Sequence, residues 1–209
     1  MEKKKTIYHL IVDKSGSMSD SIENTINGFN EQVSRIHKME KEFTEQEITI
    51  GLSTFNQENY NHFFQCPPSA VRKLTTESYR PDGYTALLDS IGLVSTQIEK
   101  DIKEQSAKVD TTVVVVILTD GHENSSRLFK LEDIRKMISR LEETGKWTFS
   151  FIGATLDAVS VAESMNIKSQ NSFAFDKKDM KKEVWSKLSD SMENYLSKKR
   201  KGDDLSNLF

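Results

Sequence analysis

The chain has 209 residues, 36% of them hydrophobic and 29% charged, which is enough to bury a core without disulfide bonds or structural metals. Its 29 basic and 32 acidic residues give a formal net charge of −3, which argues against a general binder of nucleic acids or of membrane surfaces. The single cysteine, Cys66, allows no internal disulfide and favours a reducing compartment, so we expect a cytoplasmic protein.

The first predicted element is a strand over 6–12, an almost continuous apolar run of the kind that is buried on both faces of a sheet. Three lysines precede it as in a signal peptide, but the run is short, contains Tyr8 and His9, and lacks a small-residue cleavage site. A helix is predicted over 20–39, because apolar residues recur there at three- and four-residue spacings. The elements predicted after it are strands over 47–55 and 60–65, a helix over 85–105, a strand over 111–118, a helix over 131–144, a strand over 147–152, a helix over 156–165, a strand over 172–175 and a helix over 178–197.

The alternation of strands and helices predicts an α/β fold, a Rossmann-like, doubly wound and mostly parallel sheet with helices on both faces. The segment 66–84 is predicted to be loop, with a short edge strand over 71–74. The longest aliphatic run, 113–118, marks the central strand and is too short to span a bilayer. We expect one domain over 1–199 and a flexible tail over 200–209, where a short motif that docks a partner is the alternative to a frayed terminus.

Oxygen-bearing side chains follow two of the predicted strands. Asp13, Ser15 and Ser17 come directly after the first strand, and Asp120 follows the central strand. Ligands of open α/β sheets bind outside the carboxyl ends of the strands, so these side chains are expected to converge. Thr85 adds a hydroxyl group from the loop before a predicted helix. Because all five candidates donate oxygen, the sequence predicts a site for Mg²⁺, with Mn²⁺ or Ca²⁺ as alternatives.

The pattern Asp13-x-Ser15-x-Ser17, with Thr85 and Asp120 later in the chain, resembles the metal-ion-dependent adhesion site (MIDAS) of von Willebrand factor A domains. The resemblance covers nearly the whole chain. It implies that Ser15, Ser17 and, in some states, Thr85 bind the ion directly, whereas the two carboxylates often act through water. It also implies an open coordination position that is filled by an Asp or Glu of a protein partner.

The segments 83–87 and 119–126 look most like those of small free-standing bacterial members of that family. One departure is Tyr84, where many members have Gly or Asn, but the following threonine is kept. Two other features of the chain have simpler interpretations. His122 is expected to be a solvated loop residue, and the run 177–183 a solvated helix start.

The resemblance and the donor set favour a metal-dependent protein-binding module over an enzyme, because no general base stands beside an evident nucleophile. The alternative is a magnesium-dependent phosphoryl-transfer enzyme with Asp13 as nucleophile. That segment resembles the D-x-D-x-T pattern of haloacid-dehalogenase-like phosphatases, except that Ser15 replaces the second Asp. A third possibility is a structural subunit whose metal only stabilises a loop. A helix N-cap would explain Asp13, Ser15 and Ser17 but neither Thr85 nor Asp120.

Overall fold

The computed structural model describes residues 3–105 and 109–209. Its strands are β1 (Lys3–Asp13), β2 (Gln46–Phe55), β3 (Asn59–Cys66), β4 (Val109–Thr119), β5 (Trp147–Gly153) and β6 (Ser172–Ala174). Its α-helices are α1 (Ile22–Glu42), α2 (Leu87–Glu104), α3 (Leu131–Glu142), α4 (Ala158–Ser164) and α5 (Lys187–Lys201). Shorter helical turns are η1 (Gly16–Ser21), η2 (Pro68–Ala70), η3 (Ser169–Asn171), η4 (Lys177–Asp179) and the π-helical η5 (Lys181–Ser186). Apart from the edge strand at 71–74, every predicted strand and helix is present with its ends moved by a few residues, although the first turns of the last helix are 3-10 and π-helical.

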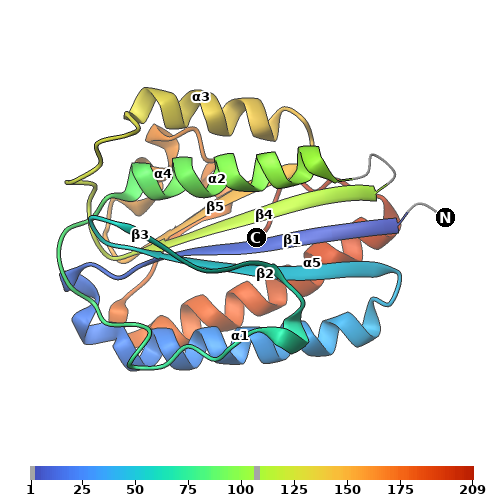
Figure 1. The fold of residues 1–209 in the computed structure, drawn as a ribbon, viewed down its shortest axis with the longest axis horizontal. Coiled ribbons are helices and arrows are strands. Elements are labelled where there is room, and N and C mark those ends of the chain that lie inside the picture. The colour runs from blue at the N-terminus through green and yellow to red at the C-terminus, as the bar shows by residue number, and fades with distance from the viewer. Residues whose placement is uncertain (1–2, 106–108) are drawn as a thin grey trace.

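The six strands form one sheet in the order β3-β2-β1-β4-β5-β6 (Figure 1). Only the hairpin partner β3 is antiparallel to its neighbour, and the other four pairs of neighbouring strands are parallel. From β1 the chain first builds outward to β2 and β3, then returns to β4 and builds in the opposite direction. The topology therefore switches between β1 and β4, and the predicted doubly wound α/β fold is confirmed.

Helices cover both faces of the sheet, with α1 and α5 on one side and α2 and α3 on the other (Figure 1). Alternate residues of β1 and β4 divide between two apolar clusters, as the pleat of a strand requires. The α5 side of the core contains four apolar residues that recur at three- and four-residue spacings in the last helical segment: Val184, Leu188, Met192 and Tyr195. Two buried faces on the central strands explain why the sequences of β1 and β4 are almost continuously apolar.

The predicted edge strand over 71–74 is not a strand. The side-chain amide of Asn30 on α1 forms hydrogen bonds with the backbone groups that a neighbouring strand would otherwise bond. Its Nδ2 donates to the carbonyl oxygen of Leu74 at 2.9 Å, and its Oδ1 accepts from the Leu74 N–H at 2.9 Å. Leu74 is buried under α1, so its apolar side chain reflects docking on a helix and not pairing in the sheet.

The residues after α5 also differ from the expected flexible tail. Gly202 ends the helix in the left-handed conformation, with φ of 78°, and the chain then turns back toward β5 and β6. The Leu208 side chain is buried in the core, and its N–H donates to Asn171 Oδ1 at 2.9 Å. The Phe209 ring packs edge-on against Phe173, with the ring centroids 4.9 Å apart. These contacts make the last residues part of the packed domain.

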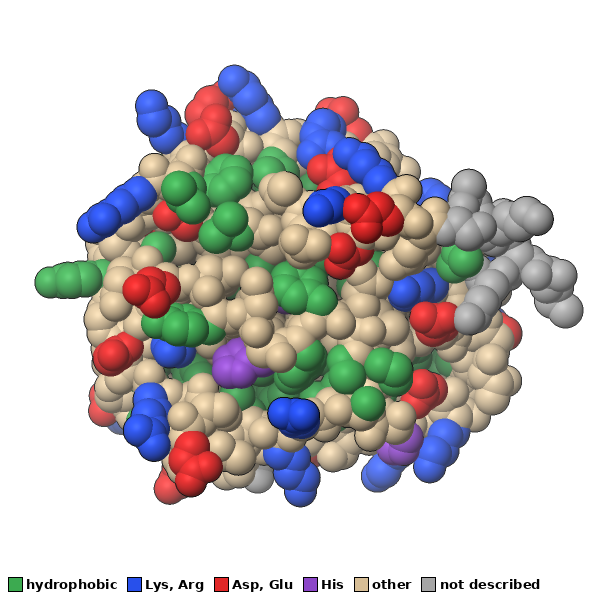
Figure 2. Space-filling model, viewed as in Figure 1, with side chains coloured by type: hydrophobic (Ala, Val, Ile, Leu, Met, Phe, Trp, Pro, Cys, Tyr) green, Lys and Arg blue, Asp and Glu red, His purple; other side chains and the backbone are tan. Residues whose placement is uncertain are grey.

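Acidic and basic side chains are interspersed on the face shown in Figure 2, and no broad field of one sign covers it. Hydrophobic side chains protrude at the left end of the same view, the end at which the loops follow the parallel strands in Figure 1. Over the described residues no helix is both long and apolar enough to cross a membrane.

Candidate metal centre

The two predicted carboxylates lie side by side because β1 and β4 are neighbouring parallel strands. Val12 is paired with Leu118, so Asp13 ends one strand where Thr119 ends the other, and Asp120 follows directly. This is the switch point of the sheet, where β1 leads to α1 on one face and β4 to α3 on the other, and ligands of open α/β sheets bind at such a point.

Asp13 is fully buried, and both of its carboxylate oxygens accept hydrogen bonds. Oδ1 accepts from the backbone N–H of Ser15 at 2.6 Å, and Oδ2 accepts from the hydroxyl of Thr119 at 2.6 Å. Burial raises the pKa of Asp13 to about 6, while the hydrogen bonds from Thr119 and Ser15 act in the opposite direction. The carboxylate is thus fixed in position and poorly solvated, so a nearby cation would stabilise its charged form.

The two serines and Asp120 form a chain of oxygens. The hydroxyl oxygens of Ser15 and Ser17 are 3.0 Å apart, and the Ser17 hydroxyl donates to Asp120 Oδ1 at 2.6 Å. Ser15 and Asp120 are buried, whereas Ser17 lies at the surface. The predicted i, i+2, i+4 spacing after β1 therefore does bring both hydroxyls to the end of β4.

Thr85 reaches the same place from the loop before α2. Backbone hydrogen bonds join this loop to the one after β1, from Gly16 N to Gly83 O at 3.1 Å and from Asp82 N to Lys14 O at 2.9 Å. Gly83 has a φ of +73°, a left-handed conformation that favours glycine, and a β-carbon there would also displace the end of the Gln57 side chain.

Asn124 holds Thr85 from the other side. The Thr85 N–H donates to Asn124 Oδ1 at 2.9 Å, and the Asn124 N–H donates to the Thr85 carbonyl oxygen at 3.0 Å. Neither Asn124 nor Thr119 was predicted to have a part at the site. Both lie in the segment 119–126, which the family resemblance had already singled out.

Gly121 marks the point on which the donors converge. A β-carbon built on Gly121 would lie 3.1 Å from Thr85 Oγ1, 3.4 Å from Ser17 Oγ and 3.6 Å from Asp13 Oδ2. Three oxygens from two separate segments thus surround a space beside Gly121 that a larger residue would fill. Among the described residues no group of three or more His, Cys, Asp or Glu side chains could hold a metal, so an ion here would depend on the hydroxyls as well as the carboxylates. A hard cation fits such a donor set.

Lys177 is a further residue at the site, and the sequence interpretation missed it. Its ammonium group forms an ion pair with Asp120 Oδ2 and donates to the backbone carbonyl oxygen of Ser17 at 2.9 Å. The run 177–183 was expected to be a solvated helix start, and no local pattern distinguishes its first lysine from the others. The expectation for His122 is confirmed, since 63% of its side chain is exposed.

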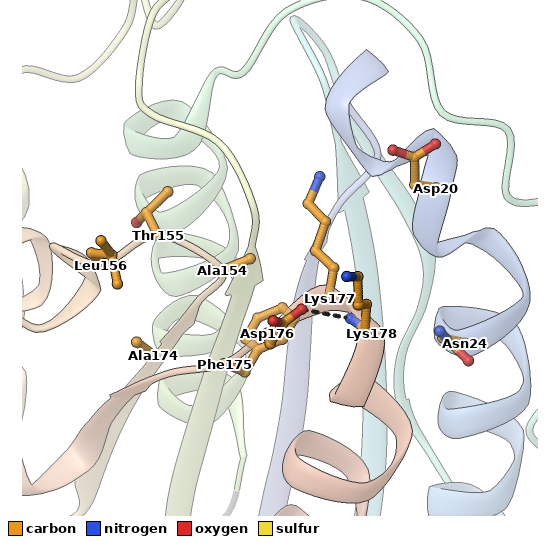
Figure 3. Close-up of a pocket in the computed structure, with 10 residues that line it drawn as sticks. All are labelled: Asp20, Asn24, Ala154, Thr155, Leu156, Ala174, Phe175, Asp176, Lys177 and Lys178. Carbon is orange, nitrogen blue, oxygen red and sulfur yellow. Dashed lines mark hydrogen bonds between the residues drawn. The ribbon is translucent and has the colours of Figure 1, made fainter.

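A cavity of about 770 Å³ opens beside Lys177 (Figure 3). Its walls are the start of α1, the turn after β5 and the segment between β6 and α5. Several of the most exposed large hydrophobic residues lie in the loops at the same edge of the sheet: Tyr84, Leu128 and Leu156 are 68%, 67% and 104% exposed. Tyr60 lies on β3, next to β2, and the Lys14 ammonium lies over its ring, 3.7 Å from the centroid.

The sequence model of the von Willebrand factor type A domain matches residues 9–191. A search of curated proteins finds no match.

Solved structures with a similar fold include the PilB minor pilin from Streptococcus sanguinis, at a TM-score of 0.62 and 12% identity over 92% of this chain and 62% of the pilin. A manganese-loaded TRAP protein of Plasmodium vivax is similar at a TM-score of 0.53 and 13% identity, over 86% of this chain and 71% of that one. Proximal thread matrix protein 1 from the mussel byssus, with a zinc-occupied MIDAS motif, is similar at 0.53 and 16% identity, over 91% of this chain and 44% of that one. The chain spans about three fifths of the pilin and under half of the byssus protein.

Proposed function

Because the chain belongs to the von Willebrand factor type A domain family, we propose that it is a metal-dependent protein-binding module that docks an acidic side chain of its partner onto a divalent cation. The observation that carries this proposal is the convergence of oxygens from Thr85, Ser17 and Asp13 on the space in front of Gly121. Two proteins of similar fold support the same assignment: the TRAP protein is manganese-loaded, and the byssus protein has a zinc-occupied MIDAS motif.

In this proposal Asp13, Ser15, Ser17, Thr85 and Asp120 hold the ion. Mg²⁺ suits hard oxygen donors and retains positions for other ligands, and Mn²⁺ or Ca²⁺ are the alternatives. When bound, the ion supplies a concentrated positive charge at the edge of the sheet. The three hydroxyl donors are neutral, and the resemblance implies that the two carboxylates often act through water, so the ion keeps a strong demand for charge at its open position and favours an anionic ligand such as Asp or Glu.

The surroundings of the site favour binding over catalysis. The exposed side chains of Tyr84, Leu128 and Leu156 offer apolar contacts around the site, as a protein partner would require. The interspersed charges in Figure 2 favour a protein partner over nucleic acid. In the phosphoryl-transfer alternative Asp13 would attack phosphorus, but both of its oxygens already accept hydrogen bonds and the side chain is buried. Free Cys66 is in keeping with a cytoplasmic setting.

The first test measures metal binding directly. Calorimetry with Mg²⁺ and Mn²⁺ should show binding to the unmodified chain that is lost when Ser15 and Ser17 are both changed to Ala. The matched control is Ser34→Ala with Ser164→Ala, which removes two exposed helical hydroxyls away from the site. Equal affinity in the Ser15/Ser17 variant would contradict the proposed ligand set.

The second test addresses the partner. A protein captured in the presence of Mg²⁺ should be released by chelator, and Thr85→Ala should weaken its binding more than it weakens metal binding, because Thr85 comes from a separate loop. Phosphatase activity should stay at background. A turnover that disappears in Asp13→Asn would favour the phosphoryl-transfer alternative, and a partner that is insensitive to chelator would move the docking surface elsewhere.

A further inference from the structure

Lys177 places a cation of the chain itself on one of the proposed metal ligands. It belongs to η4, which follows β6, and its ammonium pairs with Asp120 Oδ2. The Asp120 side chain is fully buried, whereas 33% of the Lys177 side chain is exposed. Figure 3 shows the long Lys177 side chain extending away from Asp176 and Lys178, the neighbours that line the same cavity.

The ammonium connects two of the three segments that form the site. It contacts Asp120 after β4 and donates to the Ser17 carbonyl oxygen after β1. Asp120 Oδ1 accepts from the Ser17 hydroxyl, whereas Oδ2 has no hydrogen-bond partner among the described residues and is compensated by its ion pair with Lys177. A buried carboxylate without a cation or donor is strongly unfavourable, and this contact removes that cost.

An ion bound through Asp120 would compete with this contact. The divalent ion and the ammonium would both be drawn to one carboxylate, and their mutual repulsion grows in poorly solvated surroundings. A monovalent ion offers Asp120 no more charge than the ammonium already does, whereas a divalent ion offers twice as much. Lys177 is also attached to the protein, so its local concentration at the site does not depend on the solution.

We propose that Lys177 determines the specificity of the site, as a built-in monovalent cation that holds Asp120 and Ser17 in place until a divalent ion displaces it. The inference rests on the proposed function. Displacing the ammonium costs every entering ion the same free energy, so divalent ions, which bind Asp120 strongly, still enter, whereas weakly bound monovalent ions are excluded. The cavity that Lys177 lines leaves room for the ammonium once it is displaced.

The test compares Lys177→Met with the control Lys178→Met, which removes the same charge from an exposed lysine of the same cavity. Calorimetry should show Mn²⁺ binding about tenfold tighter in Lys177→Met than in the unmodified chain, and unchanged in Lys178→Met. In the presence of chelator, Lys177→Met should unfold at a lower temperature than the unmodified chain, because Asp120 loses its counter-charge. Lys178→Met should unfold at the same temperature as the unmodified chain.

A potassium titration tests the charge specificity. Potassium chloride, compared with choline chloride at equal ionic strength, should weaken Mn²⁺ binding in Lys177→Met and leave the unmodified chain unaffected. If Lys177→Met does not fold without metal, Lys177→Gln keeps a donor for the Ser17 carbonyl oxygen and should give the same changes.

Equal or weaker Mn²⁺ binding in both Lys177 variants would overturn this inference and leave the proposed function standing. Equal sensitivity to potassium in the variant and the unmodified chain would overturn the assigned specificity. Absence of Mn²⁺ binding in every variant, including those without the lysine, would overturn the proposed function itself and the inference with it.

Discussion

His9 is a buried imidazole in the middle of β1. Its Nε2 lies 2.9 Å from Ser53 Oγ, and the Ser53 hydroxyl in turn donates to Asn61 Oδ1 at 2.7 Å. This arrangement makes Nε2 the donor and leaves Nδ1 as a buried acceptor, and Nδ1 has no hydrogen-bond partner among the described residues. A second proton on the ring would therefore have no acceptor. Burial lowers the pKa of His9 to about 3.

Stability should accordingly depend on the protonation of His9. Its folded pKa lies below the unfolded value of 6.5, so its contribution is complete above pH 6.5 and is lost as the pH falls toward 3. The expected loss approaches about 1.4 kcal/mol per pH unit. Denaturant unfolding between pH 5 and 7 should show a smaller pH slope in His9→Gln than in the unmodified chain.

The control for this measurement is His122→Gln, in an exposed loop, which should leave the slope unchanged. Asp13 titrates in the same range, but it is common to all three proteins and cancels in the comparison. An unchanged slope in His9→Gln would mean that the imidazole can be protonated in the folded state at little cost.

At the level of single residues, the sequence predicted the proposed ligands because each lies next to a recognisable strand end or loop. Asp13, Ser15 and Ser17 share one short segment, and the sheet topology brings Asp120 beside them. Lys177 could not be found in this way, because its contact with Asp120 depends on where the chain enters η4 after β6. In the sequence it is one lysine in a charged run.

At the level of elements, the start of α2 is held by an acid from another loop. Both oxygens of Glu123 are used: they accept from the N–H of Leu88 in the first turn of α2 at 2.9 Å and from the N–H groups of Ser125 and Ser126. In return, Asp89 on α2 accepts from the N–H groups of 127–129. The loop after Asp120 and the helix after Thr85 are therefore locked together.

Replacing Glu123 with Gln should weaken this lock. The amide keeps the shape of the side chain, but it loses the charge at the helix N-terminus and turns an NH₂ group toward backbone donors. We expect the free energy of unfolding to fall by about 1–3 kcal/mol, measured by chemical denaturation. Glu132→Gln, at the exposed start of α3, should cost only a few tenths of a kcal/mol. Equal effects of the two substitutions would mean that the loop contacts contribute nothing.

Elements whose termini depend on distant side chains were the hardest to predict. The periodicity located α2 because Leu88, Ile91 and Ile98 recur on one face, yet nothing near its start marks Glu123 as the group that caps it. The apolar residues at 71–74 predicted an edge strand because burial against a helix and burial in a sheet leave similar local patterns. The Asn30 amide that decides between them lies on α1.

For the whole molecule, the regular alternation of strands and helices was sufficient to predict the doubly wound sheet. Parallel neighbouring strands need a crossover connection, usually a helix. Strands β1 and β4 are buried on both faces of the sheet, and their almost continuously apolar sequences indicate this. The packing of residues 200–209 against the domain could not be predicted in this way. The segment runs from basic to acidic residues and ends in apolar ones without a period, and the surface that it packs on is formed by β5 and β6.

The C-terminal segment should therefore contribute to the stability of the whole domain. Leu208 is 2% exposed within the α1 and α5 side of the core, Thr148 Oγ1 donates to the Leu205 carbonyl oxygen at 2.7 Å, and the Lys187 ammonium lies 4.8 Å from the centroid of the Phe209 ring. Leu208→Ala should lower the free energy of unfolding by about 2–5 kcal/mol. Leu156→Ala, which removes the same atoms from a fully exposed side chain, should change it by less than about 0.5 kcal/mol. Chemical denaturation in chelator measures both without any contribution from a bound ion. If Leu208→Ala were as stable as Leu156→Ala, the segment would not be docked in solution, and its apolar end would be free to bind a partner.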